Sequence, residues 1–328
     1  MILEVPKVSY ISNVEDIHNK RFVSAISSRF TIDQFYLQNS AFIDINYIAK
    51  NSNIVVFTPL TLNTDLIDGI SNLPLIGICM AYEINEESKD PILREQLIEN
   101  ISKCSAVVCD SLYIENILRN EFKFKQEIIK FAYGCDQELF LPIKFKDSQK
   151  LRIISTRNWT KIHANQVLVN ALYKLNGEGI DFEANLYGTE SELDEFLISQ
   201  ISNVNHPRIS IRGEYINDEL PALFGNHEIY ISTSLSDGTS VSLLEALSAG
   251  RICVCRDFPT NREWIEDGIN GFLFNDTDQL IKILMRLNDL DFPHKKNISV
   301  AARNSVLGIG NWQIQKTKLL DLIARYSN

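Results

Sequence analysis

The fold is decided by the stretch Ser236-Asp237-Gly238-Thr239-Ser240-Val241-Ser242-Leu243-Leu244-Glu245-Ala246-Leu247-Ser248-Ala249-Gly250. Asp237-Gly238 is typical of a turn, and Ser242 with Glu245 has the spacing of a capping box, so we expect a helix to begin near Ser240. Apolar residues continue this helix to Gly250, which suits the left-handed position after a helix end. The apolar run Ile252–Cys255 that follows is typical of a buried strand.

A helix that begins here offers a site for a phosphorylated ligand. The first N–H groups of a helix are unpaired and carry a partial positive charge, so the residues from Gly238 to Val241 can hold a diphosphate without a metal ion. Glu245 lies about one and a half turns further on, where its carboxylate can accept hydrogen bonds from sugar hydroxyls. The alternative is a solvated Asp237 in a turn and a Glu245 that only caps the helix.

The stretch resembles the donor-site signature of GT-B glycosyltransferases, specifically glycosyltransferase family 4, the retaining glycosyl transferases of group 1. In that signature two acidic residues are separated by seven others, and Asp237 and Glu245 have this separation. Leu244–Gly250 closely follows the family's Leu-Glu-Ala-Met/Leu-Ala-x-Gly run, whereas Asp237 stands where the family usually has Glu. The resemblance implies that Glu245 binds the ribose and that Asp237 contacts the donor sugar.

Segments on both sides extend the resemblance. Asp257–Phe274 resembles the family's next loop, helix and strand, and Ile153–Lys161 resembles the first strand and loop of its nucleotide domain. In that loop an Arg and a Lys grip the donor diphosphate, and Arg157 and Lys161 are the matching positions; alone, they would be two surface cations. The resemblance implies a catalytic set of Arg157, Lys161 and Asp237. The implied donor-binding residues are Gly188, Arg212, Gly213, Glu214, Gly238, Thr239, Ser240, Val241 and Glu245.

The first part of the chain shows a weaker resemblance. Ala106–Ser111 and Ala132–Pro142 are similar to a family strand that ends in Ser and to the family's hinge entry. After the strand Leu75–Cys79 the family normally carries a His near the reacting sugar, and Met80 stands there in this chain. The candidate acceptor-side residues are Asn13, His18, Tyr82 and Glu83. The alternative for His18 is a histidine that lies on the surface or caps a helix.

Strands and helices alternate along the chain, which indicates mostly parallel sheets. At 328 residues the chain exceeds what one hydrophobic core comfortably supports, so two domains are expected. The expected strands are Val8–Ile11, Phe35–Leu37, Ile54–Phe57, Leu75–Cys79, Ala106–Cys109 and Ile128–Phe131, then Arg152–Ser155, Glu183–Tyr187, Ile209–Arg212, Glu228–Ser232, Ile252–Cys255 and Phe272–Phe274. The expected helices include Ile17–Ser27, Pro91–Ser102, Leu112–Glu121, His163–Leu175, Ser191–Ser202 and Asp278–Leu287.

The GT-B resemblance implies an α/β fold of two doubly wound Rossmann-like domains that face a central cleft. Residues 1–145 would form an acceptor-side domain and residues 146–310 a nucleotide-sugar-binding domain, with Leu141–Lys150 as the linker. Residues 311–328 would form a C-terminal helix that crosses back to the first domain.

Composition excludes several other classes. A formal net charge of -10 argues against a nucleic-acid partner, because the chain has no basic stripe to meet a phosphate backbone. The six cysteines lie mostly in apolar runs without a Cys-x2-Cys pair, so we expect reduced core residues and no metal site. No Gly-x-Gly-x-x-Gly follows the first strand, which excludes a dinucleotide fingerprint. No apolar run suits a membrane span or signal peptide, so a cytoplasmic location is expected. Peripheral contact of the N-terminal domain with the inner face of the membrane stays open.

The resemblance implies a retaining, metal-independent, hexosyltransferase-type glycosyltransferase (EC 2.4). It would move a sugar from a nucleoside-diphosphate-sugar donor, a substrate rather than a cofactor, to a hydroxyl of a glycan or lipid-linked acceptor. Bacterial surface polysaccharide or glycoconjugate synthesis is the expected setting. One alternative is a catalytically lapsed GT-B partner subunit of another transferase, which Met80 and Asp237 motivate. A second is a nucleotide-sugar epimerase on the same architecture, although its catalytic set cannot be located in this sequence.

Overall fold

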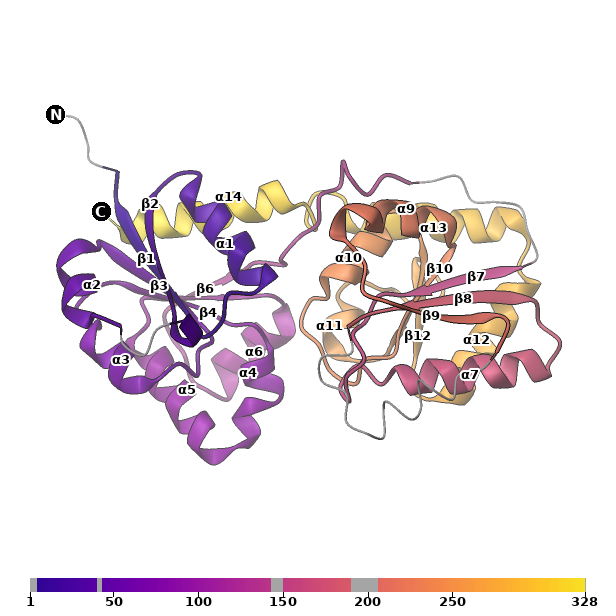
Figure 1. Cartoon of the computed structure of the whole chain (residues 1–328), viewed down its shortest axis with the longest axis horizontal. Helices are drawn as coiled ribbons and strands as arrows, with labels where there is room; N and C mark the ends of the chain where they lie inside the picture. Colours follow the sequence, from indigo (N-terminus) through magenta and orange to yellow (C-terminus); the bar gives the residue numbers. More distant parts are fainter. Residues whose placement is uncertain (1–4, 40–42, 143–149, 190–205, 328) are drawn as a thin grey trace. The chain divides into compact units, whose positions relative to one another are not determined.

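The computed structural model describes residues 5–39, 43–142, 150–189 and 206–327. The chain divides into two compact units, Met1–Tyr133 with Gln313–Asn328, and Gly134–Trp312 (Figure 1). Each unit contains one six-stranded sheet, and all the paired strands in it are parallel. The predicted α/β fold of two doubly wound domains is confirmed.

The sheet of the first unit has the strand order β2-β1-β3-β4-β5-β6. Its strands are β1 (Lys7–Ser12), β2 (Thr31–Tyr36), β3 (Ile54–Thr58), β4 (Leu75–Ile78), β5 (Ala106–Cys109) and β6 (Glu127–Lys130). The strand predicted at Phe35–Leu37 is misplaced, because β2 begins at Thr31. As an edge strand, β2 is nowhere fully buried and carries polar residues in its first half, so the apolar pattern begins too late to mark its start.

Two helices cover one face of this sheet, α1 (Ile17–Ser27) and α14 (Trp312–Tyr326) (Figure 1). An ion pair of 2.6 Å between Arg29 and Asp321 and a hydrogen bond of 3.2 Å from the Ala132 N–H to Gln315 bind α14 to this unit. The opposite face packs against the remaining helices. These are α2 (Ile45–Asn51), α3 (Thr64–Gly69), α4 (Tyr82–Asn85), α5 (Pro91–Lys103) and α6 (Leu112–Asn120), with 3-10 turns η1 (Leu37–Asn39) and η2 (Glu87–Lys89).

The sheet of the second unit has the order β12-β11-β10-β7-β8-β9. Its strands are β7 (Leu151–Ser155), β8 (Phe182–Tyr187), β9 (Ile209–Gly213), β10 (Ile229–Ser232), β11 (Ile252–Arg256) and β12 (Gly271–Phe274). The order reverses between the neighbours β7 and β10. In open parallel sheets ligands bind outside the carboxyl ends of the strands at such a switch point, so the loops after β7 and β10 are where a site is expected.

Helices α7 (Asn165–Gly177) and α12 (Thr277–Asp289) lie side by side on one face of this sheet (Figure 1). On the other face α10 (Val241–Ser248) packs beside α13 (Phe292–Val306). The remaining elements are α9 (Leu220–Asn226), α11 (Pro259–Arg262) and the 3-10 turn η3 (Asn217–Glu219). The predicted helix Ser191–Ser202 and most of the predicted linker Leu141–Lys150 lie outside the described residues.

Arg251 is a fully buried arginine directly after α10, with 1% of its surface exposed. Its guanidinium donates hydrogen bonds to the carbonyls of Ala249 at 2.8 and 2.9 Å, His227 at 2.7 Å and Phe224 at 3.3 Å. Burial lowers the pKa of Arg251 to about 10, so the side chain stays charged at neutral pH. One side chain therefore satisfies carbonyls at the ends of both α9 and α10.

Replacing Arg251→Met should lower the free energy of unfolding of the second unit by about 3 kcal/mol, because the buried carbonyls of Ala249, His227 and Phe224 each lose the guanidinium as a donor. All three tryptophans lie in this unit, so tryptophan fluorescence during urea unfolding reports on it. Lys282→Met, at an exposed position on α12, is the matched control and should change little. A loss no larger than that of the control would contradict the structural role of Arg251.

Candidate functional site

The loops after β7 and β10 are joined by an ion pair between Arg157 and Asp237. Arg157 Nη2 lies 2.6 Å from Asp237 Oδ2, and the two side chains are only 13% and 25% exposed. Burial lowers the pKa of Arg157, but the Asp237 carboxylate together with Tyr230, Tyr215 and Cys255 more than offsets this, so the pKa is raised above its ordinary value. Two residues predicted to act together, from loops far apart in sequence, thus meet at the switch point of the sheet.

The start of α10 lies beside the loops after β7 and β10 and belongs to the same site. The helix begins at Val241 with Ser240 as its N-cap, which confirms the predicted start, and Gly250 has the expected left-handed φ of 67°. The predicted capping box is wrong, because Ser242 lies inside the first turn. Its hydroxyl contacts the Tyr230 hydroxyl at 2.9 Å and accepts from Arg157 at 3.3 Å. Ser240 Oγ likewise accepts from Arg157, at 2.9 Å, and does not cap the helix.

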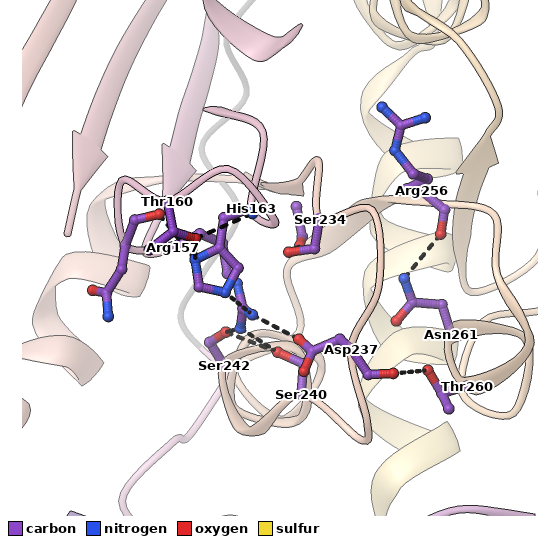
Figure 2. A network of polar contacts seen from close by, with 12 residues as sticks. Arg157, Thr160, His163, Ser234, Asp237, Ser240, Ser242, Arg256, Thr260 and Asn261 are labelled. Carbon is purple, nitrogen blue, oxygen red and sulfur yellow. Dashed lines mark hydrogen bonds and ion pairs between the residues drawn. The ribbon is translucent and has the colours of Figure 1, made fainter. Parts of the chain in front are cut away.

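His163 completes the surroundings of the Arg157 guanidinium (Figure 2). Its Nε2 lies 2.8 Å from Arg157 Nη2, and its Nδ1 lies 3.0 Å from the carbonyl oxygen of Asn158. Burial and the charge of Arg157 lower the pKa of His163 to about 3, so the ring is neutral. A carbonyl oxygen only accepts, hence Nδ1 carries the hydrogen and Nε2 accepts from Arg157. The sequence indicated His163 only as the start of a helix. Its position in a polar loop directly after a strand was the one signal that could have marked it as a site residue.

The loop after β8 packs tightly against the β7 loop and is hydrogen-bonded to the end of β9. Gly188 has φ 147°, and a Cβ there would lie 2.4 Å from the carbonyl oxygen of Arg157, so only glycine permits this approach. Gly188 donates its N–H to the carbonyl of Gly213 at 2.8 Å. Arg212 and Glu214 are exposed, and Arg212 Nε donates to Asn185 on β8 at 2.7 Å. The structure therefore brings Gly188 and Gly213 to the site and directs Arg212 Nε toward a neighbouring strand.

Other predicted donor residues lie on the loops after β7 and β10 and on α10. Glu245 is half-buried on α10. The pKa of the Tyr215 hydroxyl is raised, mainly because Tyr215 is buried and to a smaller extent because the Glu245 carboxylate is near. The sequence did not indicate Tyr215. Gly238 is buried, as is Thr239, whose hydroxyl accepts from the Trp264 indole at 3.4 Å. Lys161 is exposed in the turn before α7. The carbonyl of Asp237 accepts from the Thr260 hydroxyl at 3.1 Å, which fixes the loop after β10 (Figure 2).

The predicted acceptor-side residues lie in the first unit. The His18 ring is edge-on to Tyr133, with centroids 5.9 Å apart, and the Tyr133 hydroxyl contacts the sulfur of Met80 at 2.6 Å. Asp16 caps α1, so His18 is not its capping residue. Asn13 and Tyr82 are exposed, although no hydrogen bond connects either side chain to this group in the described residues. Tyr133 therefore links His18 to the position where the family normally has its histidine.

Glu83 is buried beneath this loop, with 1% of its surface exposed. Its carboxylate accepts from the Met80 N–H at 3.0 and 3.2 Å and from the Leu60 N–H at 3.1 Å. Burial raises the pKa of Glu83 to about 7, although the backbone donors oppose this rise. Glu83 therefore holds the loop after β4 from inside and does not present its carboxylate to solvent.

The described residues contain no group of three or more His, Cys, Asp or Glu side chains placed to hold a metal ion. All six cysteines are buried and free, as expected for core residues. No helix among the described residues has the length and apolar character that a membrane span requires.

Residues 150–289, the sheet and helices around this site, match the family described as "Glycosyl transferases group 1". The GtfA subunit of a UDP-N-acetylglucosamine–peptide N-acetylglucosaminyltransferase from Streptococcus pneumoniae is 32% identical over 108 residues, 32% of this chain and 21% of that protein. Matches to the curated relatives span 21% to 32% of their lengths.

Two solved structures share the fold over nearly the whole chain. Sucrose-phosphate synthase from Thermosynechococcus elongatus aligns with a TM-score of 0.80 at 12% identity, covering 98% of both chains. Anabaena HepE in complex with UDP and glucose aligns with a TM-score of 0.76 at 13% identity, covering 98% of this chain and 100% of that one. The predicted GT-B fold is confirmed, and residues 150–289 are similar to the glycosyl transferases of group 1.

The stability of the β4 loop should depend on pH through Glu83. The folded state keeps the proton of Glu83 up to about pH 7, whereas an unfolded glutamate loses it near 4.5. The stabilisation is therefore complete below pH 4.5 and is lost as pH rises to 7, roughly 3 kcal/mol for a shift of this size. Hydrogen exchange of the Met80 amide, corrected for intrinsic rate, should show this loss in the wild type and not in Glu83→Gln. Equal pH dependence in the two proteins would contradict the assignment.

Proposed function

We propose that this chain is a retaining, metal-independent glycosyltransferase that moves a sugar from a nucleoside-diphosphate donor to a hydroxyl of a glycan or lipid-linked acceptor. One observation carries the proposal: Arg157, Asp237 and the start of α10 converge at the switch point of the second sheet. The setting that fits is bacterial surface polysaccharide or glycoconjugate synthesis. A lipid-linked acceptor would bring a cytoplasmic protein to the inner face of the membrane.

The chemistry requires stabilisation of a leaving diphosphate. Negative charge develops on the nucleoside diphosphate as the glycosidic bond breaks, and a guanidinium and helix N–H groups oriented beforehand lower the free energy of that state. Arg157 supplies the charge beside the α10 start, and Lys161 in the neighbouring turn adds a second cation. These groups do the work of a divalent ion, so neither a metal nor another cofactor is required.

The Arg157–Asp237 pair also suggests how the donor binds. The two Nη atoms of Arg157 make four contacts, to Ser240, Ser242, His163 and Asp237. A diphosphate can replace Asp237 as the anionic partner of Arg157, since phosphate accepts from guanidinium as a carboxylate does. Asp237 then becomes available to hydroxyls of the donor sugar, while Glu245 binds the ribose. UDP is the first nucleotide to test, because HepE is similar in fold and was solved with UDP and glucose.

On the acceptor side we assign contacts to His18 and the loop of Met80, with Asn13 and Tyr82 on the exposed surface of the first unit. Glu83 contributes by holding that loop. One observation supports the alternative of a catalytically lapsed partner subunit: Met80, which contacts Tyr133, cannot relay a proton. Turnover by the isolated chain distinguishes this alternative from an active transferase.

The first test is release of nucleoside diphosphate from UDP-, GDP- and ADP-sugars with and without candidate acceptors. One donor should be consumed, and excess EDTA should not slow the reaction. Arg157→Ala should lower the rate by about 100-fold, the cost of losing a charged donor to the leaving group. Lys174→Ala, at an exposed position on α7, is the control. Activity that EDTA abolishes and magnesium restores would contradict metal independence, and an unaffected Arg157→Ala variant would contradict the site.

A second test separates the two carboxylates. Glu245→Gln should weaken binding of the free nucleoside diphosphate by about tenfold, because an amide is a poorer acceptor for ribose hydroxyls. Asp237→Asn should not weaken that binding, since the amide competes less well for Arg157, yet it should slow sugar transfer. Calorimetric titration and rate measurements on both variants check this. Equal losses of nucleotide affinity would refute the division of roles.

A further inference from the structure

His163 is held more firmly than Asp237, the other partner of Arg157 Nη2. Its Nδ1 lies 3.0 Å from both the Asn158 carbonyl oxygen and Thr160 Oγ1, and its own N–H contacts Thr160 Oγ1 at 3.3 Å. Its carbonyl accepts from the Thr233 hydroxyl, at the end of β10, at 2.9 Å. Both the ring and the backbone of His163 are therefore fixed, whereas the side chain of Asp237, which contacts the same guanidinium (Figure 2), is 25% exposed.

We propose that His163 is a positioning residue: its Nε2 holds the Arg157 guanidinium in place while Asp237 leaves it and the donor diphosphate takes the vacated contact. This inference rests on the proposed function for the identity of the incoming anion. The proposal follows from the geometry at Arg157 Nη2. This nitrogen has two hydrogens, one directed to His163 Nε2 and the other to the Asp237 carboxylate, so Asp237 can leave while His163 stays bound.

A neutral imidazole suits this task better than a second carboxylate would. It accepts one hydrogen bond without neutralising the guanidinium, so the full charge of Arg157 remains for the diphosphate. Two charged groups face the ring: Arg157, which contacts it directly, and Asp237, which accepts a hydrogen bond from the same Nη2 atom of Arg157. Lys161 lies exposed in the preceding turn. Protonation of His163 would place two cations 2.8 Å apart, and burial beside Arg157 lowers the pKa of His163 to prevent this.

The functional test compares His163→Leu, which removes the acceptor, with His163→Gln, whose side-chain oxygen can still accept from Arg157. The dissociation constant of whichever of UDP, GDP and ADP binds the wild type should rise about tenfold in His163→Leu, the typical effect of losing a hydrogen bond to a charged group. His163→Gln should recover most of this loss. His294→Leu and His294→Gln, at an exposed position on α13, are matched controls that should bind as the wild type does. Equal affinities in His163→Leu and the wild type would overturn the proposal, as would equal losses in the Leu and Gln variants.

A second measurement does not depend on any nucleotide. Nitrogen NMR of the His163 ring in the ligand-free protein should show a neutral Nδ1–H tautomer from pH 5 to 9. In Arg157→Met the ring should titrate at higher pH than in the wild type, because the neighbouring cation is gone. Titration near pH 6.5 in the wild type would overturn the positioning role, even if nucleotide binding succeeds. If no nucleotide binds but the neutral tautomer is found, the proposed function fails and the contact of His163 with Arg157 stands.

Discussion

The ion pair between Arg157 and Asp237 is the interaction on which the site depends. It joins the loop after β7 to the loop after β10, and through Ser240 and Ser242 the same guanidinium fixes the first turn of α10. A buried ion pair contributes little net stability, because removing two charges from water costs about as much as their attraction returns. Its value lies in geometry: it places a cation, a carboxylate and a helix start within hydrogen-bonding reach of one another.

The other hydrogen-bond partners of Arg157 leave its positive charge uncompensated. Apart from Asp237, its hydrogen-bond partners are two hydroxyls and a neutral imidazole, none of which carries charge. An anion that replaces Asp237 therefore meets an uncompensated guanidinium in a largely buried position, where electrostatic interactions are strongest. The close approach at Gly188 brings the β8 loop against the backbone of Arg157.

Sequence patterns predicted the parts of this site that depend on local physics. The helix and strand between Ser240 and Cys255 follow from residue preferences and apolar periodicity, and both are present. The capping box failed because a tertiary contact with Arg157 and Tyr230 uses the Ser242 hydroxyl. The contacts of His163 were missed because they depend on how its own loop folds: Arg157, Asn158 and Thr160 surround the ring from that loop, and only Thr233 comes from the end of β10. Burial of Glu83 is equally invisible in sequence, since a glutamate near a helix start usually faces water.

The measurement that tests this account most directly is a crystal structure of the protein with the nucleoside diphosphate that binds it. We expect phosphate oxygens within hydrogen-bonding distance of the Arg157 guanidinium and of the first N–H groups of α10, with Asp237 released and His163 still in contact with Arg157. A diphosphate bound elsewhere, with the Arg157–Asp237 pair intact, would contradict this expectation.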